Sequence, residues 1–152
     1  MYRRRFLERA GVASVGIGAS VALSGCLDGL SGAIDGERDD PDGYDVAMTA
    51  DAYVPEELTV TVGDTVVWEN TSTRIHTVTA YEGAIPNDAA YFASGGFDDE
   101  ATAREEWHDN FGGELTNGER FSHTFEVPGR YDYVCVPHEF GGMYATVIVE
   151  DP

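Results

Sequence analysis

Apolar and polar residues begin to alternate with a period of two at about residue 44. Val46 and Met48 are separated by Ala47 and flanked by Asp45 and Thr49, and similar short runs follow. Turn residues such as Gly63-Asp64 and Pro128-Gly129 separate the runs. The predicted strands are 45–49, 58–62, 65–69, 76–80, 121–127, 130–135 and 143–150. Seven or eight short strands in about a hundred residues predict an all-β fold, an antiparallel β-sandwich.

Residues 81–119 interrupt this alternation with Gly-Gly and Asn-Gly pairs. The helical candidate within them is Asp98–Asn110, where acids at the start favour the positive end of a helix dipole. Its apolar face is thin, with Ala101, Ala103 and Trp107. We expect this short helix and its loops to pack as a flap beside the sandwich.

The N-terminal segment has a different character. Three arginines, Arg3 to Arg5, precede Phe6-Leu7, and an uncharged run rich in Gly, Ala and Ser extends to Leu27. This pattern predicts an export signal over residues 1–25. Two arginines, one further residue and two apolar ones resemble the twin-arginine signal.

Cys26 closes the sequence Leu-Ser-Gly-Cys, which resembles a lipoprotein cleavage box. The prediction is that Cys26 is lipidated and becomes the mature N-terminus. The alternative is an ordinary residue of a signal peptide or of an uncleaved anchor, although the glycines make the run a poor spanning helix. Both place the exported protein at the extracytoplasmic face of the cell membrane. Residues 26–43, rich in Gly, Asp and Ser, are predicted to be a flexible acidic linker to a domain over 44–152.

The charge balance is strongly acidic. The chain has 9 basic residues, all Arg, against 28 acidic ones, and residues 26–152 alone carry a net charge of −22. Repulsion among these charges destabilises a compact fold at ordinary ionic strength. At 1 M salt the Debye length is about 3 Å and the repulsion is mostly screened, so the composition indicates a halophilic protein. An acidic face that docks a cationic redox partner is the alternative interpretation. The sign of the charge excludes nucleic-acid binding.

The segment 135–143 concentrates metal-binding chemistry. Cys135, His138 and Met143 place a thiol, an imidazole and a thioether within nine residues. Soft sulfur donors beside imidazole suit copper, and two His, one Cys and a weak axial Met form the blue-copper arrangement. Zinc would fit Cys and His but not a thioether. A second histidine is therefore required, and the candidate is His76, far upstream.

Each of these residues also has a structural interpretation. Cys135, the only thiol left once Cys26 is consumed, could be a buried hydrophobe, Met143 a core residue and His76 a half-buried histidine. What favours the ligand interpretation is that the four together are what one copper ion needs. His108 and His123 lie outside the pattern and are expected to have surface roles.

The C-x₂-H-x₄-M loop with its flanking strands resembles plastocyanin, and particularly the archaeal halocyanins. The segment from Val62 to Asn70, followed by Ile75 to Val78, resembles the cupredoxin segment that delivers the first histidine ligand. The resemblance covers roughly residues 44–151. It implies a cupredoxin-type Greek-key sandwich holding one type 1 copper per chain.

Two positions depart from the family pattern. Val134 stands where plastocyanins have an aromatic residue used as a second electron route, so electrons are expected to leave through His138. The rim of that exit patch is Pro137, Phe140 and the two glycines that follow. Thr77 stands where some members carry an Asn that braces the Cys loop, which leaves the surroundings of the site open.

The sequence thus predicts a monomeric, lipid-tethered electron carrier cycling Cu(I)/Cu(II) between membrane-bound redox complexes of a halophile. One rival is an enzyme, a copper oxidase or nitrite reductase, which would need further copper ligands and more domains. The other rival is a cupredoxin-fold module that stores or hands on copper without redox traffic.

Overall fold

The computed structural model describes residues 42–152. The predicted export signal, the lipidated Cys26 and the linker up to residue 41 lie outside the described residues. Within the described part, no helix is both long enough and apolar enough to cross a membrane.

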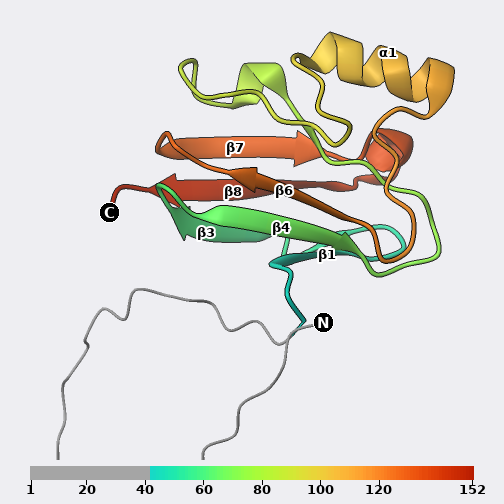
Figure 1. Ribbon diagram of the computed structural model, residues 1–152, viewed down its shortest axis with the longest axis horizontal. Helices are drawn as coiled ribbons and strands as arrows, with labels where there is room; N and C mark the ends of the chain where they lie inside the picture. Colours follow the sequence, from blue (N-terminus) through green and yellow to red (C-terminus); the bar gives the residue numbers. More distant parts are fainter. Residues whose placement is uncertain (1–41) are drawn as a thin grey trace, which may run out of the picture. The chain divides into compact units, whose positions relative to one another are not determined.

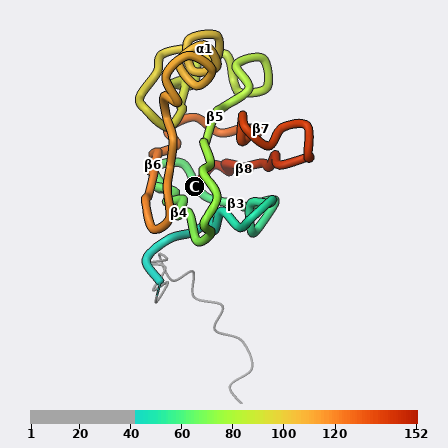
Figure 2. The backbone as a smooth tube through the Cα atoms, turned by 90° about the vertical axis from the view of Figure 1, so that its right-hand side faces the viewer, coloured from blue at the N-terminus to red at the C-terminus, as the bar shows by residue number. Residues whose placement is uncertain are grey.

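Residues 42–152 form two four-stranded sheets that pack as a sandwich (Figure 1). The first sheet has the order β2 (Tyr53–Val54), β1 (Val46–Met48), β4 (Thr65–Asn70), β6 (Arg120–Thr124). The second has the order β3 (Glu57–Thr61), β8 (Tyr144–Glu150), β7 (Gly129–Val134), β5 (Thr79–Ala80). Figure 2 shows β4 and β6 on one side of the sandwich and β7 and β8 on the other. The predicted β-sandwich is confirmed.

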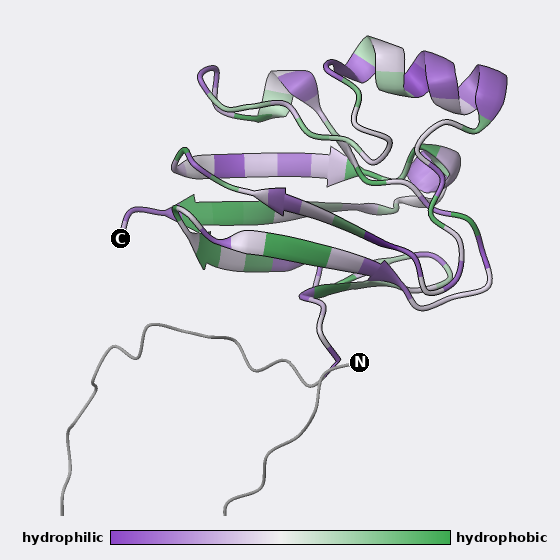
Figure 3. Ribbon diagram, viewed as in Figure 1, coloured by the Kyte–Doolittle hydropathy of each residue, from purple (hydrophilic) through white to green (hydrophobic). Residues whose placement is uncertain are grey.

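The core lies between the sheets because successive side chains of a strand point to opposite faces. Figure 3 shows this on β7, where the hydrophilic Arg130 and Asp132 alternate with the paler bands of Tyr131 and Tyr133. In β4, Val66 and Trp68 are fully buried. The Trp68 ring meets Tyr133 of the opposite sheet edge-on, with ring centroids 5.5 Å apart. Tyr131 and Tyr133 of β7 point into the same core, so Cys135 follows them inward.

The flap is present as predicted. It carries a 3₁₀ turn, η1 (Glu82–Ala84), and the helix α1 (Glu100–Asn110). Both lie above β7 in Figure 1, on the side of the edge strand β5 that Figure 2 labels. The side chain of Asp99 caps α1 by accepting a hydrogen bond of 2.7 Å from the Thr102 N–H. Ala103 is the one residue of α1 that is buried, which agrees with its thin apolar face.

Several details differ from the sequence expectation. The pairs β1–β4 and β3–β8 are parallel, so the sheets are mixed rather than wholly antiparallel. The expected strand over residues 76–80 shrinks to β5, because His76 pairs instead with Leu115 of the flap in an isolated bridge. The strand β6 ends at Thr124, and β2 was not predicted. At the end of the predicted linker, the carbonyls of Asp42 and Gly43 accept hydrogen bonds from Arg120.

Adjacent valines in β4 give a matched test of the strand register. Val66 is fully buried and Val67 faces partly outward. Val66→Ala is expected to lower the free energy of unfolding by about 2 kcal/mol, since it removes two buried carbons and leaves a cavity. Val67→Ala should cost less than about 1 kcal/mol. Urea denaturation at one fixed salt concentration measures both, and equal losses would contradict the inward register of Val66.

Candidate metal centre

Three side chains from distant parts of the chain converge at one end of the sandwich. His76 lies between β4 and β5, Cys135 follows β7 directly, and His138 lies in the 3₁₀ segment η2 (Val136–Gly141). Cys135 Sγ is 3.5 Å from His76 Nδ1 and 3.3 Å from His138 Nδ1, and the two Nδ1 atoms are 3.2 Å apart. Within residues 42–152, this is the cluster of His, Cys and acidic side chains whose ligand atoms come close enough to hold a metal ion.

The loop between Cys135 and Met143 closes on itself through backbone hydrogen bonds. The Cys135 N–H donates to the Met143 carbonyl at 2.9 Å, and the Met143 N–H donates to the His138 carbonyl at 3.2 Å. Gly142 ends the 3₁₀ segment at a positive φ of 85°, which favours glycine. These bonds place the Met143 backbone beside Cys135 and His138, and the Met143 side chain is buried.

Thr77 joins the two segments that supply the cluster. Its N–H donates to Cys135 Sγ at 3.4 Å, and its hydroxyl Oγ1 accepts a hydrogen bond of 2.9 Å from the Val136 N–H. Its carbonyl in turn accepts a 2.6 Å hydrogen bond from the Tyr53 hydroxyl. The threonine that departs from the family pattern therefore braces the Cys loop itself.

The imidazole of His76 is oriented from behind by Ser72 and Asn70. Ser72 Oγ lies 3.0 Å from His76 Nε2 and also donates to Asn70 Oδ1 at 2.9 Å. A hydroxyl that donates to Asn70 is free to accept from Nε2–H, so the network assigns the proton to Nε2 and leaves a lone pair on Nδ1. Sequence inspection did not assign either residue to the site, although Ser72 lies only four residues before His76.

The site holds its groups neutral before any metal binds. Burial raises the pKa of the Cys135 thiol to about 11, which outweighs the opposing hydrogen bond from the Thr77 N–H. Burial, helped by neighbouring His138, lowers the pKa of His76 to about 4. Burial also lowers the pKa of His138. Two neutral imidazoles and one thiol therefore face each other at neutral pH.

One edge of the cluster reaches solvent. His76 and Cys135 are fully buried, whereas His138 and Pro137 are half-buried and the Phe140 side chain is fully exposed. The predicted exit-patch residues thus lie on the exposed side of the site. Of the histidines outside the cluster, His108 is exposed, but His123 is half-buried and stacks on Phe92 with centroids 4.6 Å apart. The predicted surface role of His123 is therefore wrong, since its ring packs against Phe92.

A family model described as "Copper binding proteins, plastocyanin/azurin family" matches residues 44–150. The chain belongs to this family. It is 31% identical over 146 residues to a chloroplastic plastocyanin of Oryza sativa subsp. indica, covering 93% of this chain and 77% of the relative. It is 32% identical over 99 residues to an amicyanin of Paracoccus versutus, covering 64% of this chain and 58% of the relative.

Solved structures of this family share the fold. An oxidized amicyanin variant superposes with a TM-score of 0.50 at 30% identity, covering 69% of this chain and 79% of the amicyanin. A part of a copper-containing nitrite reductase from Thermus scotoductus, 22% of its chain, also shares the fold, with a TM-score of 0.52 at 23% identity over 70% of this chain.

Copper fits the residues present. The cluster offers two imidazole nitrogens and one thiol, the soft and borderline donors that copper takes from proteins. Met143 stands beside them as the thioether that the blue-copper arrangement adds. His76, Cys135, His138 and Met143 are thus positioned as a type 1 copper site, as the sequence predicted.

The Thr77 brace can be removed without changing side-chain size. Thr77→Val leaves the buried Val136 N–H without its acceptor, which should lower the unfolding free energy of the copper-free protein by about 1–3 kcal/mol. Thr77→Ser keeps the hydroxyl and should lose less than about 1 kcal/mol. Chemical denaturation in high salt measures both variants. Equal losses would mean that the hydroxyl does not carry the brace.

The neutral state of the site predicts its proton balance. Because His76 and His138 have lowered pKa values and Cys135 a raised one, copper(II) uptake at pH 7.5 should release about one proton, from the thiol. The lowered pKa of His76 also predicts a pH dependence of stability. As pH falls below about 6.5, His76 binds a proton in the unfolded chain but stays neutral in the folded one, so the free energy of unfolding of the copper-free protein should fall. Calorimetry in buffers of different ionisation enthalpy counts the protons. A release of two or more at pH 7.5 would show that a histidine is charged in the copper-free site.

Proposed function

We propose that the protein is a halocyanin-like type 1 copper carrier that shuttles single electrons between membrane-associated redox partners at the cell surface. The observation that carries the proposal is the convergence of His76, Cys135 and His138 in a chain of the plastocyanin/azurin family. The plastocyanin and amicyanin relatives support electron carriage rather than turnover of a substrate.

The chain's own residues suit a carrier because they hold the ligands before the metal arrives. Thr77 fixes the Cys135 sulfur, the Ser72 hydroxyl fixes the His76 ring, and the loop that closes through Met143 N–H fixes His138. Bound copper supplies the one-electron couple between Cu(I) and Cu(II). Ligands that cannot rearrange between the two states keep the barrier to electron transfer small, and hydrogen bonds to the Cys sulfur tune the potential.

Electrons would leave through His138. It is the one predicted ligand with partial exposure, and Pro137 and Phe140 surround it with an apolar rim. Val134 offers no aromatic second route, and its side chain is buried. Small, weak interfaces of the kind used by redox partners would suffice for contact at this rim.

The cellular setting is part of the proposal. The signal pattern over residues 1–25 and the lipoprotein box at Cys26 support export and a lipid anchor on the extracytoplasmic face of the cell membrane. A lipid with several acyl chains would hold the protein there durably, at roughly 0.8 kcal/mol per buried methylene. The net charge of −19 supports a halophilic environment, in which salt screens the repulsion.

The decisive experiment is a visible spectrum of the protein in high salt after addition of Cu(II). An intense blue band that ascorbate bleaches is expected from Cu–thiolate charge transfer, and Cys135→Ser should abolish it. Met143→Leu is the comparison variant, since it keeps the thiolate and both histidines and should keep a blue colour. A folded protein that stays colourless would contradict the proposed function, whereas a blue protein without a reversible potential would favour copper storage or delivery.

A further inference from the structure

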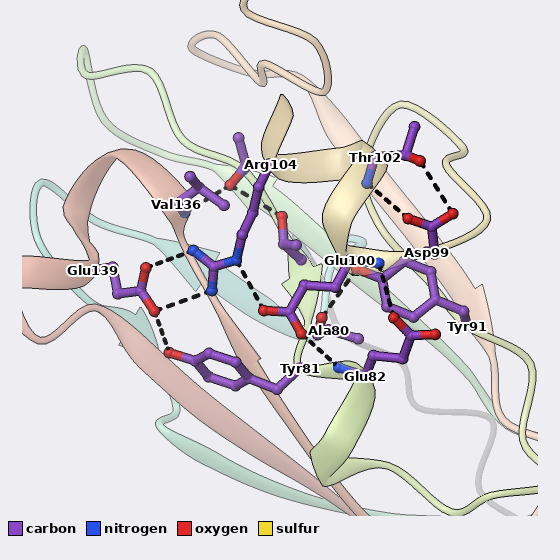
Figure 4. A network of polar contacts seen from close by, with 12 residues as sticks. Ala80, Tyr81, Glu82, Tyr91, Asp99, Glu100, Thr102, Arg104, Val136 and Glu139 are labelled. Atoms are coloured by element: carbon purple, nitrogen blue, oxygen red, sulfur yellow. Dashed lines mark hydrogen bonds and ion pairs between the residues drawn. The ribbon is translucent and has the colours of Figure 1, made fainter. Parts of the chain in front are cut away.

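The inserted helix α1 is joined to the metal-binding loop by an ion pair. Arg104 of α1 contacts both carboxylate oxygens of Glu139, the residue directly after His138 (Figure 4). The Nη1–Oε2 distance is 2.7 Å and the Nη2–Oε1 distance is 3.1 Å. A two-point contact between planar groups fixes their relative orientation as well as their separation.

The groups around this pair complete a network. The Tyr81 hydroxyl donates to Glu139 Oε1 at 2.9 Å, and Arg104 Nε contacts Glu100 Oε1 at 2.8 Å. Glu100 Oε2 accepts from the Glu82 N–H at 2.9 Å. Both oxygens of Glu139 are therefore bonded, and the flap segments η1 and α1 are connected to the loop that carries His138.

Other restraints on this side of the loop are few. Phe140, Gly141 and Gly142 are exposed, and α1 buries only Ala103. The side chains of Arg104 and Glu139 are 27% and 31% exposed, so solvent screens their attraction less than that of a free surface pair. The contact is thus a two-point side-chain link between the helix and the loop.

We propose that Arg104 and Glu139 form a clamp through which the inserted helix positions His138. The inference rests on the proposed function insofar as His138 is a copper ligand. Both are positioning residues: the clamp acts on the loop backbone, and through it on the imidazole, without touching the metal. The Gly142 N–H donates to the Glu139 carbonyl and the Met143 N–H to the His138 carbonyl, so a shift of Glu139 is passed to His138 and Met143 through the loop backbone.

Loss of the charge at the clamp and loss of its geometry are expected to affect the copper site differently. Arg104→Gln leaves an unneutralised carboxylate near the metal, which favours Cu(II) and lowers the reduction potential. Glu139→Gln removes a negative charge and leaves the Arg104 guanidinium paired with Glu100 alone, which raises the reduction potential. Loosening of the loop, in contrast, has the same sign in both variants. Arg104→Lys separates the two effects, because it keeps the charge but cannot form the two-point contact.

The experiment compares Arg104→Lys, Arg104→Gln and Glu139→Gln in the full chain, in high salt. Arg130→Gln is the matched control, since it removes another partly exposed ion pair, with Asp132 on β7. The first measurement is the rate at which a chelator takes Cu(I) from the reduced protein. All three clamp variants should lose copper about tenfold faster, as for other groups that orient ligands, and Arg130→Gln should match the wild type.

The second measurement needs no copper. Hydrogen exchange of the Gly142 and Met143 amides, followed by NMR in the copper-free protein, should accelerate in the clamp variants and not in Arg130→Gln. Arg104→Lys with wild-type exchange and copper release would overturn the clamp, as would equal changes in Arg130→Gln. If the wild type binds no copper but the amides still respond, the proposed function fails while the clamp stands.

Discussion

The site depends on one junction, where Thr77 meets the end of β7. Two segments 58 residues apart are joined there by the Thr77 N–H on Cys135 Sγ and by the Val136 N–H on the Thr77 hydroxyl. These bonds lie in the buried core, where losing a partner leaves a polar group without water. Because Cys135 and His76 flank this junction, its geometry sets the distance between the buried sulfur and the buried imidazole.

The packed sandwich makes this junction rigid, and the flap adds a second restraint through its contacts with the ligand loop. Trp68 and Tyr133 pack the two sheets together directly behind Cys135. On the other side, η1 and α1 reach the ligand loop through Tyr81, Arg104 and Glu139, the network drawn in Figure 4. The half-buried His138 therefore lies in a loop that contacts both the buried core and the helix α1.

The few arginines of the described part show how an acidic chain uses positive charge. Arg104, Arg120 and Arg130 each pair with specific carboxylates, at Glu139, Glu69 and Asp132. Arg74 instead bonds the Ala50 carbonyl beside the metal centre. At molar salt, loose surface attraction is screened over about 3 Å, so short contacts such as these keep most of their directional effect. The acidic surface then contributes solubility and leaves the architecture to packing and hydrogen bonds.

The sequence by itself determined the strand pattern and most of the ligand set. The alternation of apolar and polar residues identifies a strand from the sequence alone. Cys135, His138 and Met143 are close in space because they share one short loop. Only the tertiary structure brings His76 to these residues. It also decides that Thr77 and Ser72 form hydrogen bonds that orient the predicted ligands, and that Arg104 pairs with Glu139. It also shortened the strand after His76, which pairs with Leu115 of the flap. Such contacts join residues far apart in the chain, and a long-range hydrogen bond leaves no periodic trace in the sequence around either partner.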